Sequence, residues 1–364
     1  MKPVFFILAF LASKFLWAGP LFNQFDGVRP TGMGNAFIAL ADDANALWYN
    51  PAGLADIKGV HVNIFNFLVG VDSADTLSRL ENAIFKGDTK NLIRQDKEYL
   101  RFNFFPSLIT PHFGVSLFSQ TQGYFDISNL ASQGLEVRSF HDQGLIAGGA
   151  FTFNDYLSIG VSVRGFYRSE VDLSLTPQEV IDQYGIDATN LLDNIYSELS
   201  NQAGHGYGFG INTGIKLNVP LKSRGKNSPR LYLAATADDI GNTTLRAQGN
   251  YLAPKVLKQS FNFGGALIYP FSKAWTWNLI ADVRHAFEPT DFIRLFHIGT
   301  EIKNSIFGFR AGANQGYLTY GFSLEFPPHT RLHFSSYGVE LGQKRWEKEQ
   351  RWYLVQLNIG FNPN

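Results

Sequence analysis

The sequence predicts an all-β fold, a transmembrane antiparallel β-barrel of about 14 strands with an N-terminal hatch (plug) segment. Three observations predict it: a secretion-type start, stretches that alternate apolar and polar residues up to the C-terminus, and an unusual composition. The 364 residues include 33 Phe, 15 Tyr and 6 Trp, yet the mean hydropathy is only −0.09. A membrane barrel resolves this tension, because one face of each strand meets lipid and the other meets a polar lumen. The alternative is a soluble, Phe-rich secreted β protein.

Residues 1–18 have the layout of a secretory signal peptide. Lys2 precedes an apolar run over 4–11, and the small residue Ala18 stands near the expected cleavage point. No later stretch contains the ~18 apolar residues that a transmembrane helix needs. An exported chain of this kind is expected in the periplasm or in the outer membrane of a Gram-negative bacterium, and the composition favours the outer membrane.

Composition also narrows the function. The chain has no cysteine, which excludes thiolate metal sites, disulfides and cysteine nucleophiles. Its formal net charge is +0, so no basic surface for nucleic acid is expected. The 8 histidines are scattered without the spacing of metal ligands, and no Gly-x-Ser-x-Gly nucleophile motif occurs. We therefore expect no enzyme activity, no metal and no cofactor, although some outer-membrane barrels are enzymes.

Residues 19–58 lack the alternation of strands and form the predicted hatch. Small, acidic and turn-forming residues punctuate this segment and are the candidates for a hatch or gating role: Gly32, Gly34, Asp42, Asp43, Asn50, Pro51 and Ala52. The two glycines do not make a dinucleotide-binding motif, because no strand precedes them and no third glycine follows. For the acidic pair, a structural hydrogen-bonding role is favoured over metal binding. The asparagine before the proline should be extended, so its side chain can cap nearby backbone groups.

The barrel itself is predicted over residues 59–364. Its clearest strand is 351–361, and ~10 residues of alternation suffice for a tilted strand to cross the hydrocarbon. Similar stretches are predicted at 59–71, 100–109, 112–127, 134–153, 155–175, 205–219, 229–247, 257–270, 273–287, 291–303, 305–314, 316–326 and 329–342. Short and long connections alternate between them, as in barrels with periplasmic turns and larger outer loops. Phe361, near the C-terminus, resembles the terminal signal that the barrel-assembly machinery reads.

Two of the outer loops, 75–99 and 176–201, are predicted to contain helices. The second begins with Thr176 as the expected cap and Pro177 in the first turn. Apolar residues of these loops are the candidates for ligand capture: Leu77, Leu80, Ile84, Leu191, Leu192, Ile195 and Leu199. These residues either pack the helices onto the barrel rim or offer a landing surface for a hydrophobic ligand, and both roles can hold together.

Strand alternation directs several charged residues toward the lumen. The candidates are Arg164, Arg168, Asp282, Arg284, Glu301, Arg310 and Glu325, with His333 as a similar polar candidate. A charge on the lipid face would cost ~2–4 kcal/mol at the bilayer midplane, which favours the inward direction. These charges either form an ion network that supports the hatch or pair with the head group of a ligand.

The order of motifs in the predicted hatch resembles the N-terminal region of FadL/TodX-type transporters of hydrophobic compounds. The matching motifs are Gly32-x-Gly34-x-Ala36, Ala41-Asp42-Asp43-Ala44 and Asn50-Pro51-Ala52. The resemblance implies a monomeric barrel that is plugged from the periplasmic side, takes up long-chain fatty acids or aromatic hydrocarbons, and releases them sideways into the membrane. PorV-like barrels of a protein secretion system share this signature, so a structural or shuttle role is the alternative.

The expected function is therefore passive uptake of hydrophobic compounds such as long-chain fatty acids. The expected partners are these ligands, outer-membrane lipid and the barrel-assembly machinery, and no nucleic acid. A general porin is disfavoured, because residues 19–58 can fill the lumen. Pro106, Pro111, Gly114 and Gly123 can break regular strand pairing, which places the expected side opening in the wall near 100–127.

Overall fold

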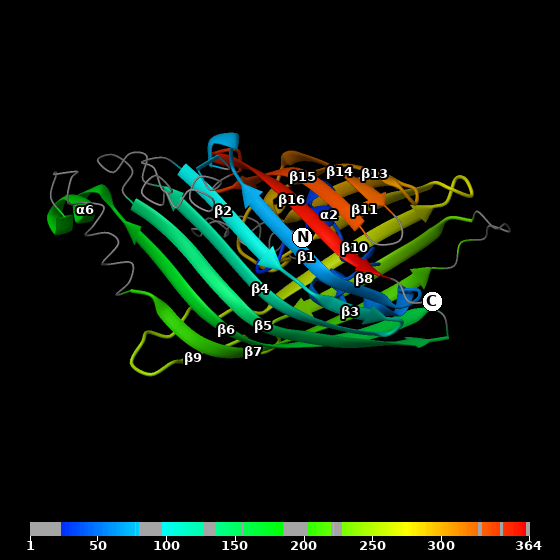
Figure 1. The fold of residues 1–364 in the computed structure, drawn as a ribbon, viewed down its shortest axis with the longest axis horizontal. Helices are drawn as coiled ribbons and strands as arrows, with labels where there is room; N and C mark the ends of the chain where they lie inside the picture. Colours follow the sequence, from blue (N-terminus) through cyan, green and yellow to red (C-terminus); the bar gives the residue numbers. More distant parts are fainter. Residues whose placement is uncertain are drawn as a thin grey trace, which may run out of the picture.

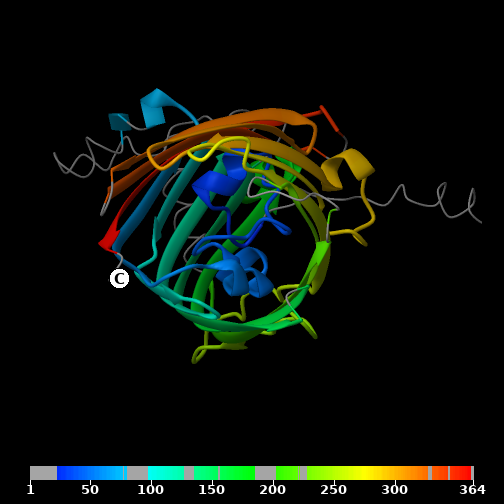
Figure 2. The ribbon, with the colours of Figure 1, turned by 90° about the vertical axis from the view of Figure 1, so that its right-hand side faces the viewer.

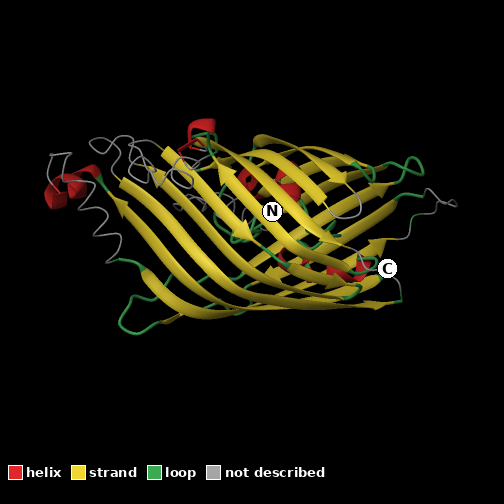
Figure 3. Cartoon of the chain, viewed as in Figure 1, coloured by secondary structure: helices red, strands yellow, loops and turns green. Residues whose placement is uncertain are grey.

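The computed structural model describes residues 23–76, 78–79, 97–126, 135–154, 156–184, 202–219, 221, 228–326, 330–342 and 345–361. Its strands are β1 His61–Val71, β2 Lys97–Phe104, β3 Ser107–Thr110, β4 Phe113–Asp126, β5 Leu135–Phe153, β6 Leu157–Leu175, β7 Gly204–Val219, β8 Arg230–Asp238, β9 Arg246–Ala247, β10 Ser260–Tyr269, β11 Thr276–Val283, β12 Phe296–Lys303, β13 Phe307–Asn314, β14 Tyr317–Phe326, β15 Thr330–Glu340 and β16 Glu349–Phe361. Figures 1 and 3 show these strands running obliquely around one elongated barrel.

The strands form a closed antiparallel barrel with fourteen wall positions. The sheet runs in chain order from β1 to β16, and β1 pairs with β16 to close it, for example at Phe67 opposite Leu357. Of the 16 strands, β2 and β3 share one wall position, and the short β9 only extends the edge of β7. The predicted fold class and strand number are therefore confirmed.

The pleat separates an apolar outer face from a polar inner face. On β14, Leu318, Tyr320 and Phe322 are exposed, whereas the alternate residues Thr319 and Ser323 are buried toward the lumen. The same division holds along β6, where exposed Val161 alternates with buried polar side chains. Successive side chains of a strand point to opposite faces, so an outer apolar band that suits lipid follows from the sequence alternation.

Some predicted strands are too long, and the structure shows why. The predicted strand 229–247 ends at Asp238, because Asp239 and Asn242 adopt positive φ values of 52° and 65° and turn the chain. The predicted strand 291–303 begins with a short helix instead, α8 Phe292–Leu295, whose Asp291 cap accepts a hydrogen bond from Ile293 N at 3.1 Å. The predicted strand 273–287 ends at Val283, which leaves Arg284 in a loop.

The wall is interrupted between β2 and β3, so the prediction of one continuous strand over 100–109 is wrong. Pro106 has no N–H to donate to a ladder, which explains the break. The backbone remains hydrogen-bonded to both neighbours: Phe105 N donates to Asn66 O at 2.9 Å, and Leu117 N donates to Pro106 O at 3.2 Å. The other residues named as strand breakers behave differently, because Gly114 and Gly123 lie in regular pairs and Pro111 lies in the tight turn before β4.

The first described residues, 23–58, lie inside the barrel (Figure 2). This hatch contains three short helical segments, α2 Val28–Gly32, α3 Ala46–Tyr49 and the 3₁₀ turn η1 Pro51–Asp56. Its apolar side chains, including Phe37, Ile38 and Leu40, are fully buried and pack with inward residues of the wall in the main hydrophobic core. The core of the protein therefore lies between the hatch and the inner face of the barrel.

The outer loops are described only in part. Helix α6 Pro177–Tyr184 follows Thr176, whose hydroxyl accepts from Glu179 N at 3.3 Å while Glu179 Oε2 accepts from Thr176 N at 2.7 Å. This reciprocal capping box is what the local sequence predicts. Residues 97–99 of the predicted loop 75–99 belong instead to β2. The candidate capture residues Leu77, Leu80, Ile84, Leu191, Leu192, Ile195 and Leu199 all lie outside the described residues. Among the described helices, none is long and apolar enough to cross a membrane.

Candidate functional site

The glycines of the hatch allow its backbone to lie directly against the wall. Gly34 has φ +67°, and a Cβ there would lie 2.4 Å from the carbonyl oxygens of Ile298 and Ala313. Its N–H donates to Thr319 Oγ1 at 2.9 Å. At Gly32 a Cβ would meet Gly321 Cα at 3.3 Å. A larger residue at Gly34 therefore conflicts with both the backbone conformation and the available space.

An ion network ties the hatch to the wall. The Arg29 guanidinium contacts Asp42 at 2.5 Å and Asp43 at 2.8 Å, both within the hatch. On its other side it contacts both oxygens of Glu301 on β12, at 2.9 and 2.7 Å. Arg310 Nε on β13 reaches the same carboxylate at 2.8 Å. Because Glu301 is completely buried, it depends on these two arginines and on Lys303, 3.8 Å away, for compensation.

The Asp42 carboxylate is held ionised by two cations. Lys303 Nζ lies 3.3 Å from Asp42 Oδ2, in addition to the contact with Arg29. Burial alone would raise the pKa of Asp42, but Arg29 and Lys303 outweigh burial and hold this pKa below its ordinary value. The acidic pair of the hatch therefore serves a salt-bridge network in this structure.

The remaining hatch motifs satisfy backbone groups. Asn50 is fully buried and extended, its Oδ1 accepts from Ala52 N at 3.0 Å, and its Nδ2 donates to Ile38 O at 2.9 Å. Pro51 opens the 3₁₀ turn, where its missing N–H is not needed. On β11, Asp282 Oδ2 accepts from Phe37 N and Ile38 N, at 2.5 and 2.8 Å. These bonds fix the hatch chain between α2 and α3.

Arg164 and Arg168 lie on the inner face of β6, and both are paired. Arg164 donates to Gln24 of the hatch at 2.6 Å and also forms an ion pair with Asp239. Arg168 makes two bonds of 2.7 Å to the Asp142 carboxylate. Glu325 differs from these inner residues, because it is partly exposed near the end of β14 and pairs with Arg331 at 3.5 Å. His333 is buried on β15.

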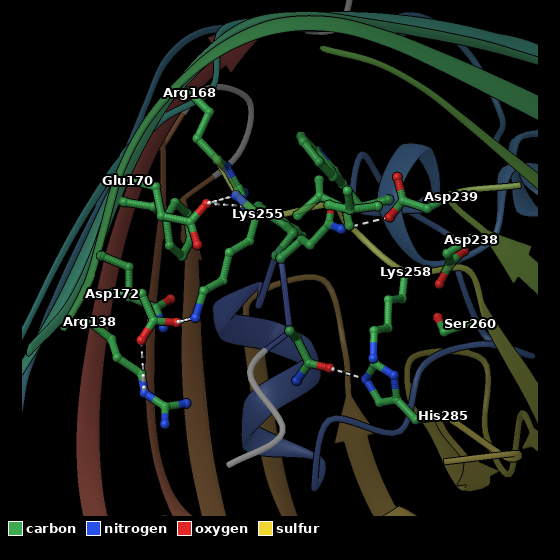
Figure 4. A pocket seen from close by; sticks show the side chains of 18 of the residues that line it. Arg138, Arg168, Glu170, Asp172, Asp238, Asp239, Lys255, Lys258, Ser260 and His285 are labelled. Carbon is green, nitrogen blue, oxygen red and sulfur yellow. Dashed lines mark hydrogen bonds and ion pairs between the residues drawn. The ribbon is translucent and has the colours of Figure 1, made fainter. Parts of the chain in front are cut away.

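A cavity of about 580 Å³ lies between the hatch and the part of β6 that leads toward α6. This volume is within the range of small-molecule sites. Hatch residues such as Trp48 and Tyr49 line one side, and residues of β4, β5, β6, β7 and β8 together with the segments 255–260 and 284–289 line the rest. Figure 4 shows how charged side chains from these elements converge on the cavity.

Most of the charges at the cavity are paired with each other (Figure 4). Asp172 contacts Lys255 at 2.5 Å and Arg138 at 3.9 Å, and Glu170 accepts from Lys255 N at 3.2 Å. These contacts attach the 255–260 loop to β6. His285 contacts Asn23 of the hatch at 3.1 Å, and burial together with the neighbouring Arg284 lowers the pKa of His285 to about 3. His285 is therefore neutral at physiological pH.

A cluster of aromatic rings separates this cavity from the break in the wall. Phe25 stacks on Trp48 with a centroid distance of 4.9 Å, and it meets Phe105 edge-on at 4.9 Å. Trp48 also meets Phe118 edge-on at 5.0 Å. Behind the rings is a second cavity of about 20 Å³, lined by Phe25, Trp48, Phe105 and the wall residues Ser107 and Ser116, among others. Phe25 and Trp48 therefore border both cavities.

Sequence reasoning missed several of these residues. Arg29, Phe25 and Trp48 were not among the candidates, although they lie within the predicted hatch. Arg29 meets Glu301 across 272 positions, so no local spacing reveals the pair. The aromatic residues offered a usable signal. Large rings in a segment that is predicted to lie inside a polar lumen need apolar neighbours, and in the structure Phe25 packs within the main hydrophobic core and Trp48 packs against it. Within the described parts of the chain, no group of three or more His, Cys, Asp or Glu side chains is arranged to hold a metal ion.

Comparison with known proteins extends these observations. No protein-family profile matches the chain, and no curated protein sequence matches it. Two similar solved structures are the toluene transporter TbuX of Ralstonia pickettii (16% identity, TM-score 0.55, 94% of this chain and 100% of that one) and the CymD monoaromatic hydrocarbon channel (13% identity, TM-score 0.53, 96% and 98%). At these identities the likeness concerns the fold. The chain therefore has the barrel fold of these two channels, as the resemblance of its hatch motifs to FadL/TodX-type transporters predicted.

Proposed function

We propose that this protein takes up hydrophobic compounds, such as long-chain fatty acids, passively across the outer membrane of a Gram-negative bacterium. The compound enters the large cavity from outside and leaves sideways, through the wall at the break between β2 and β3. The observation that carries this proposal is that Phe25 and Trp48 border both the large cavity and the small cavity at the break. These two rings therefore lie between the interior site and the small cavity at the break in the wall.

The side route is closed in this structure, and hydrophobic burial supplies the free energy for capture of the ligand. The small cavity of about 20 Å³ has room for one water molecule and for no larger ligand. Rotation of Trp48 away from Phe25 and Phe118 would join the two cavities. Hydrophobic burial supplies ~25 cal/mol per Å² of apolar surface removed from water, which drives capture. Release into lipid keeps the hydrocarbon part of the ligand in apolar surroundings, so the last step does not return it to water.

The proposal includes the biogenesis of the chain. Residues 1–18 would direct export, the barrel-assembly machinery would insert the barrel next to outer-membrane lipid, and the protein would act as a monomer. Residues 19–58 would act as the hatch, with Gly32, Gly34, Asp42, Asp43, Asn50, Pro51 and Ala52 holding it in place. The apolar residues of the loops near 75–99 and 176–201 would provide the landing surface for ligand. No catalytic step is required.

Uptake of labelled oleate in cells that lack their own fatty-acid channel tests this function. Ser116→Phe adds bulk at the small cavity, and Thr213→Phe adds the same bulk at a partly exposed position on β7 as a matched control. We expect protein-dependent uptake that falls at least about tenfold in Ser116→Phe and stays unchanged in Thr213→Phe, because a blocked passage removes most of the flux. Asn50→Ala should also reduce uptake, because it removes the bonds that shape the hatch.

Two outcomes would contradict the proposal. Full uptake by a correctly folded Ser116→Phe variant would exclude the side route past β2 and β3. No uptake by the folded wild-type protein would exclude long-chain fatty acids as cargo, and it would favour other apolar ligands or the shuttle role in a secretion system. Folding of each variant in the outer membrane is checked by protease resistance and by electrophoretic mobility before and after heating.

A further inference from the structure

We infer that Arg284 binds the anionic head group of an amphiphilic ligand at the base of the large cavity. This inference rests on the proposed function, and it narrows the substrate class from hydrophobic compounds in general to amphiphiles with a negatively charged head. The two solved channels named above carry descriptions of neutral hydrocarbons, so the inference concerns residues of this chain alone.

The Arg284 guanidinium is buried but incompletely bonded. The residue is 7% exposed and lines the cavity, and its Nε and Nη1 have no hydrogen-bond partner among the described residues. The guanidinium lies over the ring of Tyr49, with Cζ 5.0 Å from the ring centroid. A stacked guanidinium keeps its donors in the plane of the group, where they can address a carboxylate with two parallel bonds. Buried donors that the protein itself does not bond are available to an anionic ligand.

The other arginines at the cavity differ from Arg284 because each has a carboxylate partner, and for Arg138 these partners are Glu136 and Asp172. Arg164 is bonded to Gln24, Asn212 and Asp239, and Arg168 is bonded to Asp142 by two nitrogens. Their charges are already compensated by wall and hatch residues. Arg284 forms no ion pair within 4.0 Å with a described carboxylate, so its charge is available to a ligand. Lys258 also lines the cavity, and its ammonium group adds a second positive charge there.

The backbone holds Arg284 in a fixed position. Its N–H donates to Leu295 O at 2.8 Å, and the next N–H, of His285, donates to Asn262 Oδ1 at 2.9 Å. His285 has φ +51° and its ring contacts Asn23 of the hatch, so the loop turns sharply and is anchored on both sides. A site that is already in place loses little conformational entropy when a ligand binds.

Nearby acids moderate the affinity. Asp238 lines the same cavity, and its Oδ2 accepts from Asn262 Nδ2 at 2.8 Å while its Oδ1 has no partner. Asp282 lies two residues before Arg284, and its Oδ2 is engaged by the hatch. These carboxylates weaken the positive potential at Arg284. Moderate affinity suits transport, because a ligand that binds too tightly is not released.

Binding of two ligands of equal chain length tests the inference. The full-length protein in lipid nanodiscs is titrated with dodecanoate and with dodecanol, with tryptophan fluorescence as the readout. We expect wild type to prefer dodecanoate, and Arg284→Gln to weaken dodecanoate binding by about tenfold or more without changing dodecanol binding, since bonds to a charged group are lost. Arg284→Lys should keep part of the preference. Asp238→Asn should tighten dodecanoate binding a few-fold.

Arg331→Gln is the matched control, because it removes an arginine from a partly exposed pair with Glu325 instead of from the cavity. Equal binding of both ligands to wild type, or unchanged dodecanoate binding by Arg284→Gln, would overturn the role of Arg284 and leave the proposed function standing. Failure of the wild type to bind either ligand would overturn both. Equal weakening of both ligands in Arg284→Gln would also overturn the inference, since it indicates a damaged cavity instead of a lost charge contact.

Discussion

At the scale of single residues, the hatch depends on side chains that are small or that serve backbone groups. Gly34 lies against two wall carbonyls at a positive φ, and Asn50 bonds to three backbone groups, those of Ala52, Ile38 and, at 3.4 Å, Ile215. A residue with a Cβ would not fit at Gly34, and an apolar residue at position 50 could not make the bonds of Asn50. The hatch motifs are therefore explained by how closely this segment packs against the wall.

Gly34→Ala tests this packing. The new Cβ would face two carbonyl oxygens at 2.4 Å, and the backbone would remain in the left-handed region. We expect a loss of at least about 2 kcal/mol in the free energy of unfolding, from strain and overpacking together. Urea titration in detergent micelles, followed by tryptophan fluorescence, measures it. Gly165→Ala, where a Cβ meets nothing within 4 Å, should change the free energy by less than about 0.5 kcal/mol; equal losses would contradict the packing argument.

Asp42 makes the stability of the hatch dependent on pH. The cations beside it hold the pKa of Asp42 below its ordinary value, so the ionised form stabilises the folded state at any pH above that ordinary value. This contribution is lost as the pH falls below about 4 toward the lower folded pKa. After correction for the intrinsic pH dependence of amide exchange, the protection of residues 23–58 against hydrogen exchange should therefore fall on acidification, and less so in Asp42→Asn. Identical pH profiles for the two proteins would rule out Asp42 as a contributor.

At the scale of elements, each irregularity has a local cause. Pro106 separates β2 from β3, and the capping box of Thr176 and Glu179 starts α6 directly after β6. The two bonds from Thr176 lower the pKa of Glu179, so this cap is complete only when the carboxylate is ionised. The outer loop therefore begins as a helix because of the local sequence Thr176–Glu179, which forms the capping box.

Thr176→Ala should loosen the first turn of α6. Loss of a threonine cap typically costs ~1 kcal/mol, which corresponds to roughly fivefold faster amide exchange over 177–184. Hydrogen exchange with mass spectrometry measures the change. Gln178→Ala, at an exposed position of the same helix, serves as the control. Exchange that does not change in Thr176→Ala would show that contacts with the barrel rim, and not the cap, hold this helix.

At the scale of the whole molecule, hatch and wall are one folding unit. Their shared core has no boundary between them, and Glu301 lies at the junction, with Arg29 on the hatch side and Arg310 on the wall side. Removing Glu301 takes the carboxylate from the buried Arg310 and leaves Arg29 with Asp42 and Asp43 only, whereas a partly exposed pair contributes little.

Glu301→Ala and Glu325→Ala form a matched pair of variants that measure this difference. Each removes a glutamate that pairs with arginine on the wall, one fully buried and one partly exposed. We expect Glu301→Ala to cost about 3–5 kcal/mol in the free energy of unfolding, and Glu325→Ala less than about 1 kcal/mol. Denaturant titration gives both values. Similar losses in the two variants would refute a central role for the hatch–wall network.

The barrel could be predicted from the sequence because lipid and lumen impose an alternation that every strand carries. The strand ends were harder to predict: the chain turns at Asp239 and Asn242 through positive φ values that asparagine and aspartate tolerate but do not require. The break at Pro106 was a visible signal, but the sequence does not show which of several prolines and glycines interrupts the ladder.

The site was less predictable because its partners are far apart in sequence. Arg284 was expected on a strand face, yet its position in the structure follows from a loop that Asn262 and Leu295 hold in place. The cavity is formed by the hatch, residues of β4 to β8 and two further segments, and no single segment contains its pattern. The alternation of a strand predicts which face a side chain points to. The hydrogen-bond partners of that side chain are known only once the barrel is closed, because they come from other strands and from the hatch.

The bond between Thr31 and Ser335 has a consequence for the order of assembly. These hydroxyls lie 2.7 Å apart although 304 positions separate them, so the first segment of the barrel domain to be synthesised docks on one of the last strands. Contacts of such sequence separation form late and slowly. The hatch therefore has no complete set of partners until β14 and β15 are in place, so the contacts that complete the core shared by hatch and wall form last.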